Sequence, residues 1–141
     1  MYNVFNPASP VGLMDFVAAA KSRIREVTPD ELQEMRSADS DLMILDVRES
    51  SEHEQGHIEN AFLIPRGILE AAADPTYPKC VPELASSHSR SIVAYCASGG
   101  RSAMAAAVLQ MMGFEKVYSL AGGFAGWEQA QMPVRREARY V

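Results

Sequence analysis

The sequence is poor in cysteine. Only Cys80 and Cys96 occur in 141 residues. Residues 11–20 come nearest to a signal-peptide core, but they contain Asp15 and follow no basic segment. We therefore expect a cytoplasmic protein in which both thiols are reduced, with a single disulfide between them as the alternative.

Positive charge and long hydrophobic runs are also scarce. The formal net charge is −5 at pH 7. Phosphate binding needs clustered Lys and Arg, so we expect no nucleic-acid partner. The cluster of Arg135, Arg136 and Arg139 lies near the C-terminus and is interpreted as solvated. Because the apolar runs are too short to cross a bilayer, we expect no membrane partner either.

The sequence does contain the material for one globular α/β domain. Its composition, with 48% hydrophobic and 22% charged residues, is near the globular average. Strands are predicted at 24–27, 42–47, 61–65, 91–95 and 116–120, and helices at 28–37, 66–73, 101–112 and 124–130. This alternation predicts an α/β fold with a central, mostly parallel five-stranded sheet and helices on both faces.

An additional helix is predicted at the N-terminus, from Ser9 and Pro10 to Lys21. Ser9 is suited to cap it, and Pro10 to be its first helical residue. Its apolar residues can dock on the domain or on a partner, which leaves a homodimer through this helix open. By contrast, three prolines in 74–89 predict a loop with one short helix at most.

Residues 53–57 read His-Glu-Gln-Gly-His and match the H-E-x-x-H pattern of zinc proteases. In those enzymes both histidines lie on one continuous helix. Here Gly56 interrupts the pattern, and the preceding strand ends at Val47, which leaves little room for a helix. The extended motif needs a glycine and a third histidine where this chain has Asn60 and Leu63. We therefore expect no metal, although a downstream glutamate remains as an alternative third ligand.

Cys96 lies between a predicted buried strand and a helix that starts at Arg101. Open α/β sheets bind ligands at such strand ends. The residues between the two are small and let successive N–H groups face one point: Ala97, Ser98, Gly99 and Gly100. A free thiol near pKa 8.5 is about 3% ionised at pH 7, and a helix N-terminus lowers that pKa. We expect Cys96 to be nucleophilic without His88 as a base, and we interpret Cys80 as a bystander.

Two stretches resemble the signatures of rhodanese-type sulfurtransferases. Residues 95–127 contain C-x-S-G-x-R-S and end on G-G-x-x-x-W. Residues 45–65 contain D-V-R-x-x-x-E-x-x-x-G-H-I-x-x-A, which assigns Glu52 and His57 to a turn. His53 departs from the family, which usually has an aromatic residue there. The resemblance divides the chain into an N-terminal helical extension at 1–23, a rhodanese-like domain at 24–133 and a C-terminal tail at 134–141.

The resemblance implies sulfur transfer through a persulfide on Cys96, with no separate cofactor. The donor would be a small molecule such as thiosulfate, and the acceptor cyanide or a thiol, including a thiol-carrying protein. The donor and the persulfide would be held by Ala97, Ser98, Gly99, Gly100, Arg101 and Ser102. Arg101 is expected to attract an anionic donor. Asp46 and Arg48, at the end of what is expected to be the central strand, would brace the loop or form an ordinary ion pair.

Two other functions remain as alternatives. Cdc25-like phosphatases and arsenate reductases use a related cradle, but their loop resembles C-x5-R. Here Cys96 and Arg101 give C-x4-R, and the smaller bowl suits a sulfur atom better than a tetrahedral oxyanion. Rhodanese-like domains also serve as non-catalytic binding modules, which commonly lack the cysteine that this chain retains.

Overall fold

The fold is built on one parallel sheet. The computed structural model describes residues 6–136. In that range the sheet has five strands in the order β1-β5-β4-β2-β3, and every neighbouring pair is parallel. The strands are β1 Arg25–Val27, β2 Met43–Asp46, β3 Phe62–Leu63, β4 Ser91–Tyr95 and β5 Lys116–Leu120. The predicted α/β architecture is confirmed, but β4 is the central strand, and β2 lies beside it.

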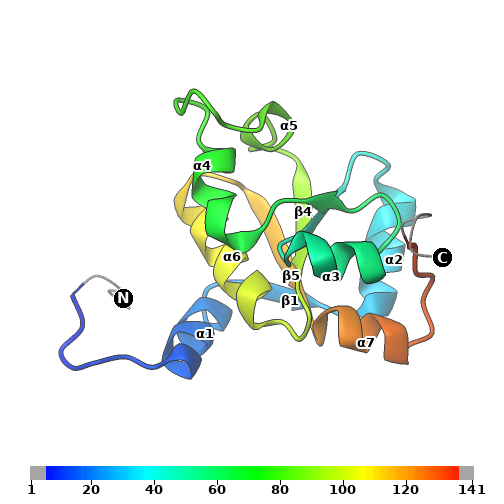
Figure 1. Ribbon diagram of the computed structural model, residues 1–141, viewed down its shortest axis with the longest axis horizontal. Coiled ribbons are helices and arrows are strands. Elements are labelled where there is room, and N and C mark those ends of the chain that lie inside the picture. Colours follow the sequence, from blue (N-terminus) through cyan, green and yellow to red (C-terminus); the bar gives the residue numbers. More distant parts are fainter. Residues whose placement is uncertain (1–5, 137–141) are drawn as a thin grey trace.

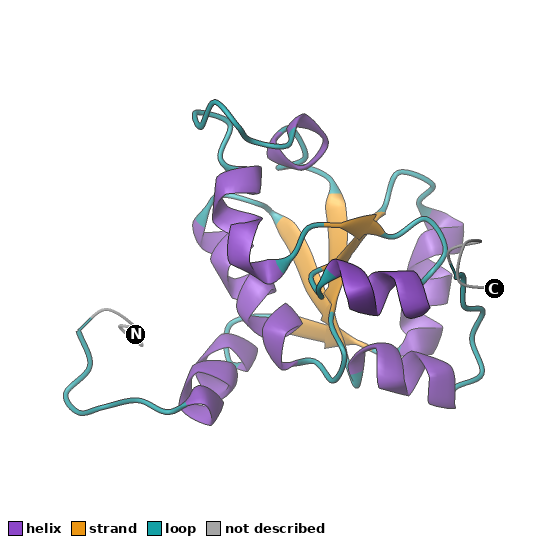
Figure 2. Ribbon diagram, in the orientation of Figure 1, coloured by secondary structure: helices purple, strands orange, loops and turns teal. Residues whose placement is uncertain are grey.

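Helices cover both faces of the sheet, as predicted. They are α1 Leu13–Lys21, α2 Pro29–Ala38, α3 Ser50–Gln55, α4 Leu69–Ala73, α5 Pro82–Ala85, α6 Gly100–Met111 and α7 Gly123–Gln129, with a 3-10 turn η1 at Arg66–Ile68. Helices α1, α4 and α6 lie on one side, and α2 and α7 on the other (Figure 1). Figure 2 shows the strands between these two groups. Within residues 6–136 no helix has the length and apolar character needed to span a membrane.

Local chemistry explains where the helices begin. Helix α2 starts as predicted, because Thr28 Oγ1 accepts the Glu31 N–H at 3.1 Å and Glu31 accepts the Thr28 N–H at 2.9 Å. Helix α1 starts later than predicted: the Asp15 carboxylate accepts the Gly12 N–H at 2.9 Å, so the cap is Gly12 and not Ser9.

Both ends of the described chain contact the domain. Val17 and Ala20 of α1 are buried, and Val17 packs close to Gly100 at the start of α6. At the other end, Arg135 forms an isolated antiparallel bridge with His57. The predicted extension at 1–23 and tail at 134–141 also include residues 1–5 and 137–141, which lie outside the described range.

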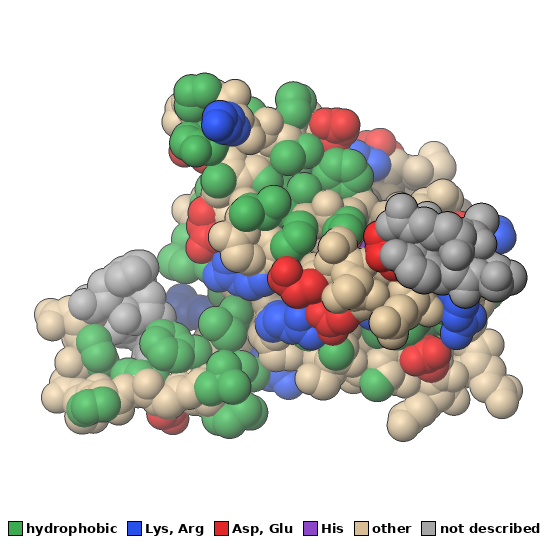
Figure 3. Space-filling view, viewed as in Figure 1, with side chains coloured by type: hydrophobic (Ala, Val, Ile, Leu, Met, Phe, Trp, Pro, Cys, Tyr) green, Lys and Arg blue, Asp and Glu red, His purple; other side chains and the backbone are tan. Residues whose placement is uncertain are grey.

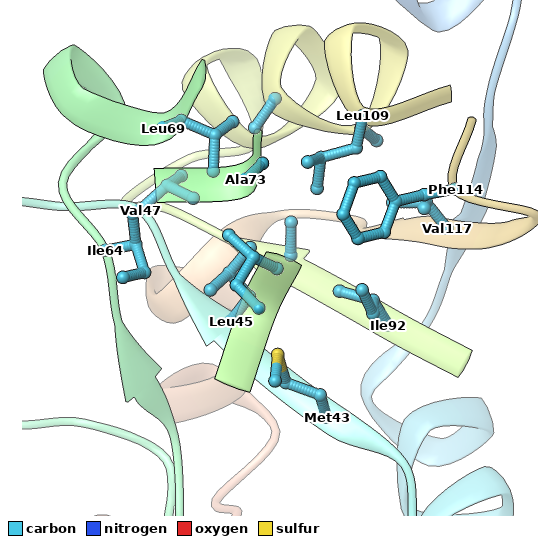
Figure 4. Packing of buried hydrophobic residues seen from close by; sticks show 14 of the residues in the cluster. Met43, Leu45, Val47, Ile64, Leu69, Ala73, Ile92, Leu109, Phe114 and Val117 are labelled. Atoms are coloured by element: carbon cyan, nitrogen blue, oxygen red, sulfur yellow. The ribbon is translucent and has the colours of Figure 1, made fainter. Parts of the chain in front are cut away.

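The hydrophobic core forms two clusters, one on each side of the sheet. Figure 4 shows the first, in which Leu45 and Ile92 of the sheet pack against Leu109 of α6. The second lies under α2 and α7 and includes the fully buried Trp127. Successive strand residues point to opposite faces. Cys96 therefore lies with the α6 cluster, whereas Tyr95 lies with the α7 cluster.

Candidate active site

The Cys96 thiol lies in a cradle of N–H groups where β4 ends and α6 begins. Its sulfur accepts the Gly99 N–H at 3.1 Å and the Ser102 N–H at 3.3 Å. Gly99 adopts φ +113°, a conformation that residues with a Cβ rarely adopt. Cys96 is only 1% exposed. The loop thus curls around the sulfur as the small residues predicted.

Two buried hydroxyls extend this cradle. The Ser102 hydroxyl lies 3.4 Å from the Cys96 sulfur and 2.8 Å from the hydroxyl of Ser119 on β5. Burial raises the pKa of the Cys96 thiol, but the Ser102 hydroxyl and loop N–H groups stabilise the thiolate. The net result is a pKa for Cys96 below the ordinary value. A lowered pKa favours the thiolate, which is the nucleophilic form of cysteine.

Helix α7 holds the loop from its other side. The Phe124 N–H donates to the Cys96 carbonyl at 2.8 Å, and the Ala125 N–H donates to the Ala97 carbonyl at 3.1 Å. Gly123 allows this approach, because a Cβ built there would lie 2.6 Å from the Cys96 carbonyl oxygen. The G-G-x-x-x-W signature thus positions the backbone of the loop that follows Cys96.

Asp46 is the centre of a buried hydrogen-bond network on the α7 side of the sheet. Its Oδ2 accepts hydrogen bonds from Arg48 Nη2 at 2.8 Å and from the Tyr95 hydroxyl at 2.9 Å. His53 Nδ1 lies 2.9 Å from the same oxygen. Burial raises the pKa of Asp46, but the bonds from Arg48 and His53 outweigh it and lower the pKa overall. The carboxylate is therefore ionised at neutral pH.

Arg48 connects this network to α7. Its guanidinium lies over the Phe124 ring at 4.5 Å and the Tyr95 ring at 5.2 Å, and it donates to the Gly56 carbonyl at 2.7 Å. Phe124 also supplies the N–H that binds the Cys96 carbonyl. Asp46 and Arg48 thus reach the loop indirectly, through the position of α7.

Arg101 forms an ion pair that the sequence reasoning did not foresee. Its Nη1 and Nη2 donate to the two carboxylate oxygens of Glu52 on α3, at 2.9 and 3.0 Å. The resemblance had assigned Glu52 only to a turn. Its sequence separation from Arg101 gives no local signal of this contact. Ser119 was missed as well, and the only hint was a serine between Tyr118 and Leu120 in a predicted strand.

The zinc-like stretch forms no converging pair of ligands. A short helix, α3, does carry His53, contrary to the expectation of little room, but it ends at Gln55 before His57. The two imidazole rings stack in parallel with centroids 3.8 Å apart. His57 Nδ1 lies 2.8 Å from the His53 carbonyl oxygen. Among residues 6–136 no group of three or more His, Cys, Asp or Glu side chains is arranged to hold a metal ion.

The remaining thiol and histidine lie elsewhere. His88 precedes β4 and stacks on Phe114 with ring centroids 4.1 Å apart. It is thus at the end of β4 opposite to Cys96, which agrees with its exclusion as a base. Cys80 is a half-buried free thiol in the connection before α5.

The chain is similar to proteins that transfer sulfur. It is 28% identical over 111 residues to a sulfurtransferase of Allochromatium vinosum, an alignment that covers 79% of this chain and 94% of the relative. Other curated relatives are longer: the chain spans 28% of an adenylyltransferase/sulfurtransferase of Mycobacterium tuberculosis, described as probable, and 52% of a putative sulfur carrier protein of Bacillus subtilis. These similarities support sulfur transfer as the activity at the level of the family.

Solved structures share the fold. A Rhodopseudomonas palustris protein of unknown function, described as a possible tyrosine phosphatase, has a TM-score of 0.82 and 32% identity, covering 92% of this chain and 98% of its own. The polysulfide-sulfur transferase homodimer of Wolinella succinogenes has a TM-score of 0.67 and 25% identity, covering 88% and 87%. Residues 28–130 match the family described as the Rhodanese-like domain. The chain therefore belongs to the rhodanese-like domain family.

Proposed function

We propose that the protein moves sulfane sulfur from a donor, such as thiosulfate, to a thiol or cyanide through a persulfide on Cys96. The Cys96 thiolate attacks the outer sulfur of thiosulfate, and the bond between the two sulfur atoms of thiosulfate breaks. Sulfite leaves with the bonding electron pair, and the enzyme keeps the transferred sulfur as Cys96–S–S⁻. An acceptor thiolate or cyanide then attacks that outer sulfur and regenerates the Cys96 thiolate.

The observation that carries this proposal is the cradle around the Cys96 sulfur. The Gly99 and Ser102 N–H groups and the Ser102 hydroxyl surround one sulfur atom within 3.4 Å. The two N–H donors favour an anionic sulfur over a neutral thiol, and the Ser102 hydroxyl, which accepts from the thiol, can turn to donate to a thiolate. The same surroundings would stabilise the persulfide anion that replaces it. The lowered pKa of Cys96 favours the thiolate, so the proposal assigns no side chain as a general base.

A phosphatase is the second candidate, because one similar solved structure is described as a possible tyrosine phosphatase. A phosphate ester would need the Arg101 guanidinium as a bidentate partner of its oxygens. In this protein both terminal nitrogens of Arg101 already bind Glu52, at 2.9 and 3.0 Å. The C-x4-R loop also closes around one sulfur atom. We therefore favour sulfur transfer.

Intact mass spectrometry tests the proposal. Thiosulfate should add the mass of one sulfur atom to the wild type and to Cys80→Ser, and cyanide should remove it. Cys96→Ser should gain nothing, since a serine hydroxyl is neither ionised nor able to hold the intermediate. Hydrolysis of an aryl phosphate should be absent. Rapid phosphate release without sulfur loading would establish the phosphatase instead, and neither activity would indicate a binding module.

A further inference from the structure

The arginines near the Cys96 loop are all paired with carboxylates. Arg48, Arg66 and Arg101 follow the carboxyl ends of β2, β3 and β4, where the loop lies. Arg101 binds Glu52, and Arg48 binds Asp46 at 2.8 Å. Arg66 binds Glu70 at 2.8 Å. Each of the three cations is therefore neutralised by its own carboxylate.

The surface agrees with this pairing. In Figure 3 basic and acidic side chains lie side by side on the face that contains α3 and the start of α6. Glu26 Oε2 lies 4.0 Å from the position of a Cβ built on Gly99, and it is paired with Lys21 Nζ at 3.7 Å, so this carboxylate is neutralised as well. The chain as a whole carries a formal charge of −5. Thiosulfate is a dianion, so this environment offers it little electrostatic attraction.

Arg101 directly precedes Ser102, whose N–H donates to the Cys96 sulfur at 3.3 Å, so the pair of Arg101 and Glu52 borders the site. Its two side chains are 39% and 33% exposed, so a donor approaching the loop can reach them. Glu52 raises the pKa of Arg101 most strongly, and the Cys96 thiolate raises it further. Arg101 in turn lowers the pKa of Glu52, so both members of the pair are ionised at neutral pH.

We propose that Glu52 sets the donor specificity of this site: by neutralising Arg101, it favours sulfane donors with at most one negative charge, such as an organic persulfide, over thiosulfate. This inference rests on the proposed sulfur transfer. The loading step is Cys96–S⁻ + R–S–SH → Cys96–S–SH + R–S⁻. A bond forms between the Cys96 sulfur and the outer sulfur of the donor, the bond between the two sulfur atoms of the donor breaks, and the thiolate R–S⁻ leaves with the electron pair. The outer sulfur keeps its proton, and no oxidant is needed.

Four proteins test this idea by changing the charge of the pair. The pair is neutral in the wild type, positive in Glu52→Gln, negative in Arg101→Ala and neutral again in the double variant. The measured quantity is kcat/KM for thiosulfate divided by kcat/KM for 2-hydroxyethyl persulfide, which removes any effect common to both donors. Gln keeps the oxygen that accepts the Glu49 N–H at 3.0 Å, so Glu52→Gln should retain α3. Thermal unfolding checks each fold.

The ratio should follow the charge of the pair. A unit charge about 6 Å from a dianion in a water-like dielectric changes the rate about tenfold at low salt. We expect the ratio to rise about tenfold in Glu52→Gln and to fall about as much in Arg101→Ala. In the double variant it should return to within about threefold of the wild type. Added salt should reduce these changes.

A matched control separates local from global charge. Glu115 is exposed and precedes β5, so it lies at the amino ends of the strands, whereas the loop lies at their carboxyl ends. Glu115→Gln makes the same change in net charge as Glu52→Gln, and it should leave the ratio unchanged. A ratio that is constant across the Glu52 and Arg101 series, while Cys96 is still loaded, would overturn this inference alone. Failure of both donors to load Cys96 in the wild type would overturn the proposed function and this inference with it.

Discussion

Replacing Gly123 with alanine should damage the active site through backbone contact alone. A Cβ at this position would lie 2.6 Å from the Cys96 carbonyl oxygen and 2.7 Å from the Ala97 carbonyl carbon. The neighbouring atoms are backbone, so no side chain can rotate away. Either α7 or the Cys96 loop must move, and the two hydrogen bonds between them must lengthen or break.

Two free-energy costs add in Gly123→Ala, one from backbone conformation and one from steric overlap, and alanine substitutions at two other glycines measure them separately. Gly123 has φ +59°, and placing alanine in the left-handed region costs about 1–2 kcal/mol. The overlap with the loop adds about 1–3 kcal/mol. Gly122 has φ +75° but only ordinary contacts, from 3.5 Å, so Gly122→Ala should show the first cost alone. Gly67 has no atom within 4 Å, so Gly67→Ala should show neither.

Urea unfolding and thiol alkylation measure the two consequences. Gly123→Ala should lower the free energy of unfolding by about 2–5 kcal/mol. It should also slow alkylation of Cys96 by iodoacetamide at neutral pH, because a displaced loop no longer stabilises the thiolate. Gly122→Ala should lose stability but keep more of the Cys96 reactivity. A Gly123→Ala protein with wild-type stability and reactivity would refute the role of this close contact.

Two further substitutions probe the cradle and the network behind it. Ser102→Ala removes the hydroxyl beside the Cys96 sulfur, so the pKa of Cys96 should rise. Alkylation of Cys96 at neutral pH should then slow on the order of tenfold. The pH profile of alkylation measures both changes. Asp46→Asn leaves Arg48 buried without its carboxylate and should cost about 3–5 kcal/mol of unfolding free energy at neutral pH. Because folding lowers the pKa of Asp46, the ionised carboxylate stabilises the fold above its unfolded pKa of about 3.9. This stabilisation is lost as the pH falls through the folded pKa. Urea unfolding should therefore show the unfolding free energies of the wild type and Asp46→Asn converging in acid.

The sequence predicted those features that depend on local pattern. Short segments between helix signals identified the five strands, two of them as apolar runs at 42–47 and 91–95, and Thr28 with Glu31 marked the start of α2. The placement of Cys96 after a buried strand, with small residues before a helix, predicted the cradle that the structure contains. In each case the information lies within a few residues, because strand period, helix caps and glycine conformations are set by neighbours in the chain.

Contacts between distant segments were not predictable in this way. Glu52 and Arg101 are separated by 49 positions, and their pairing depends on how α3 crosses the end of the sheet. The order of the strands is a similar case, since apolar runs show which segments are buried but not that β4 is central. Arg101 shows why this matters for function. An arginine in the loop suggests a cation that is free to attract an anionic donor, whereas in the fold its charge is neutralised by Glu52.

The thiolate at Cys96 also depends on where nearby carbonyl dipoles point. N–H groups at the start of α6 face the sulfur, but the same loop contains the carbonyls of Cys96 and Ala97, whose negative ends would repel an anion. Both carbonyls are bound by N–H groups of α7, from Phe124 and Ala125. Helix α7 therefore fixes these oxygens away from the sulfur while α6 supplies donors to it. This division of roles requires the backbones of loop and helix to touch, and that contact is possible only because position 123 has no side chain.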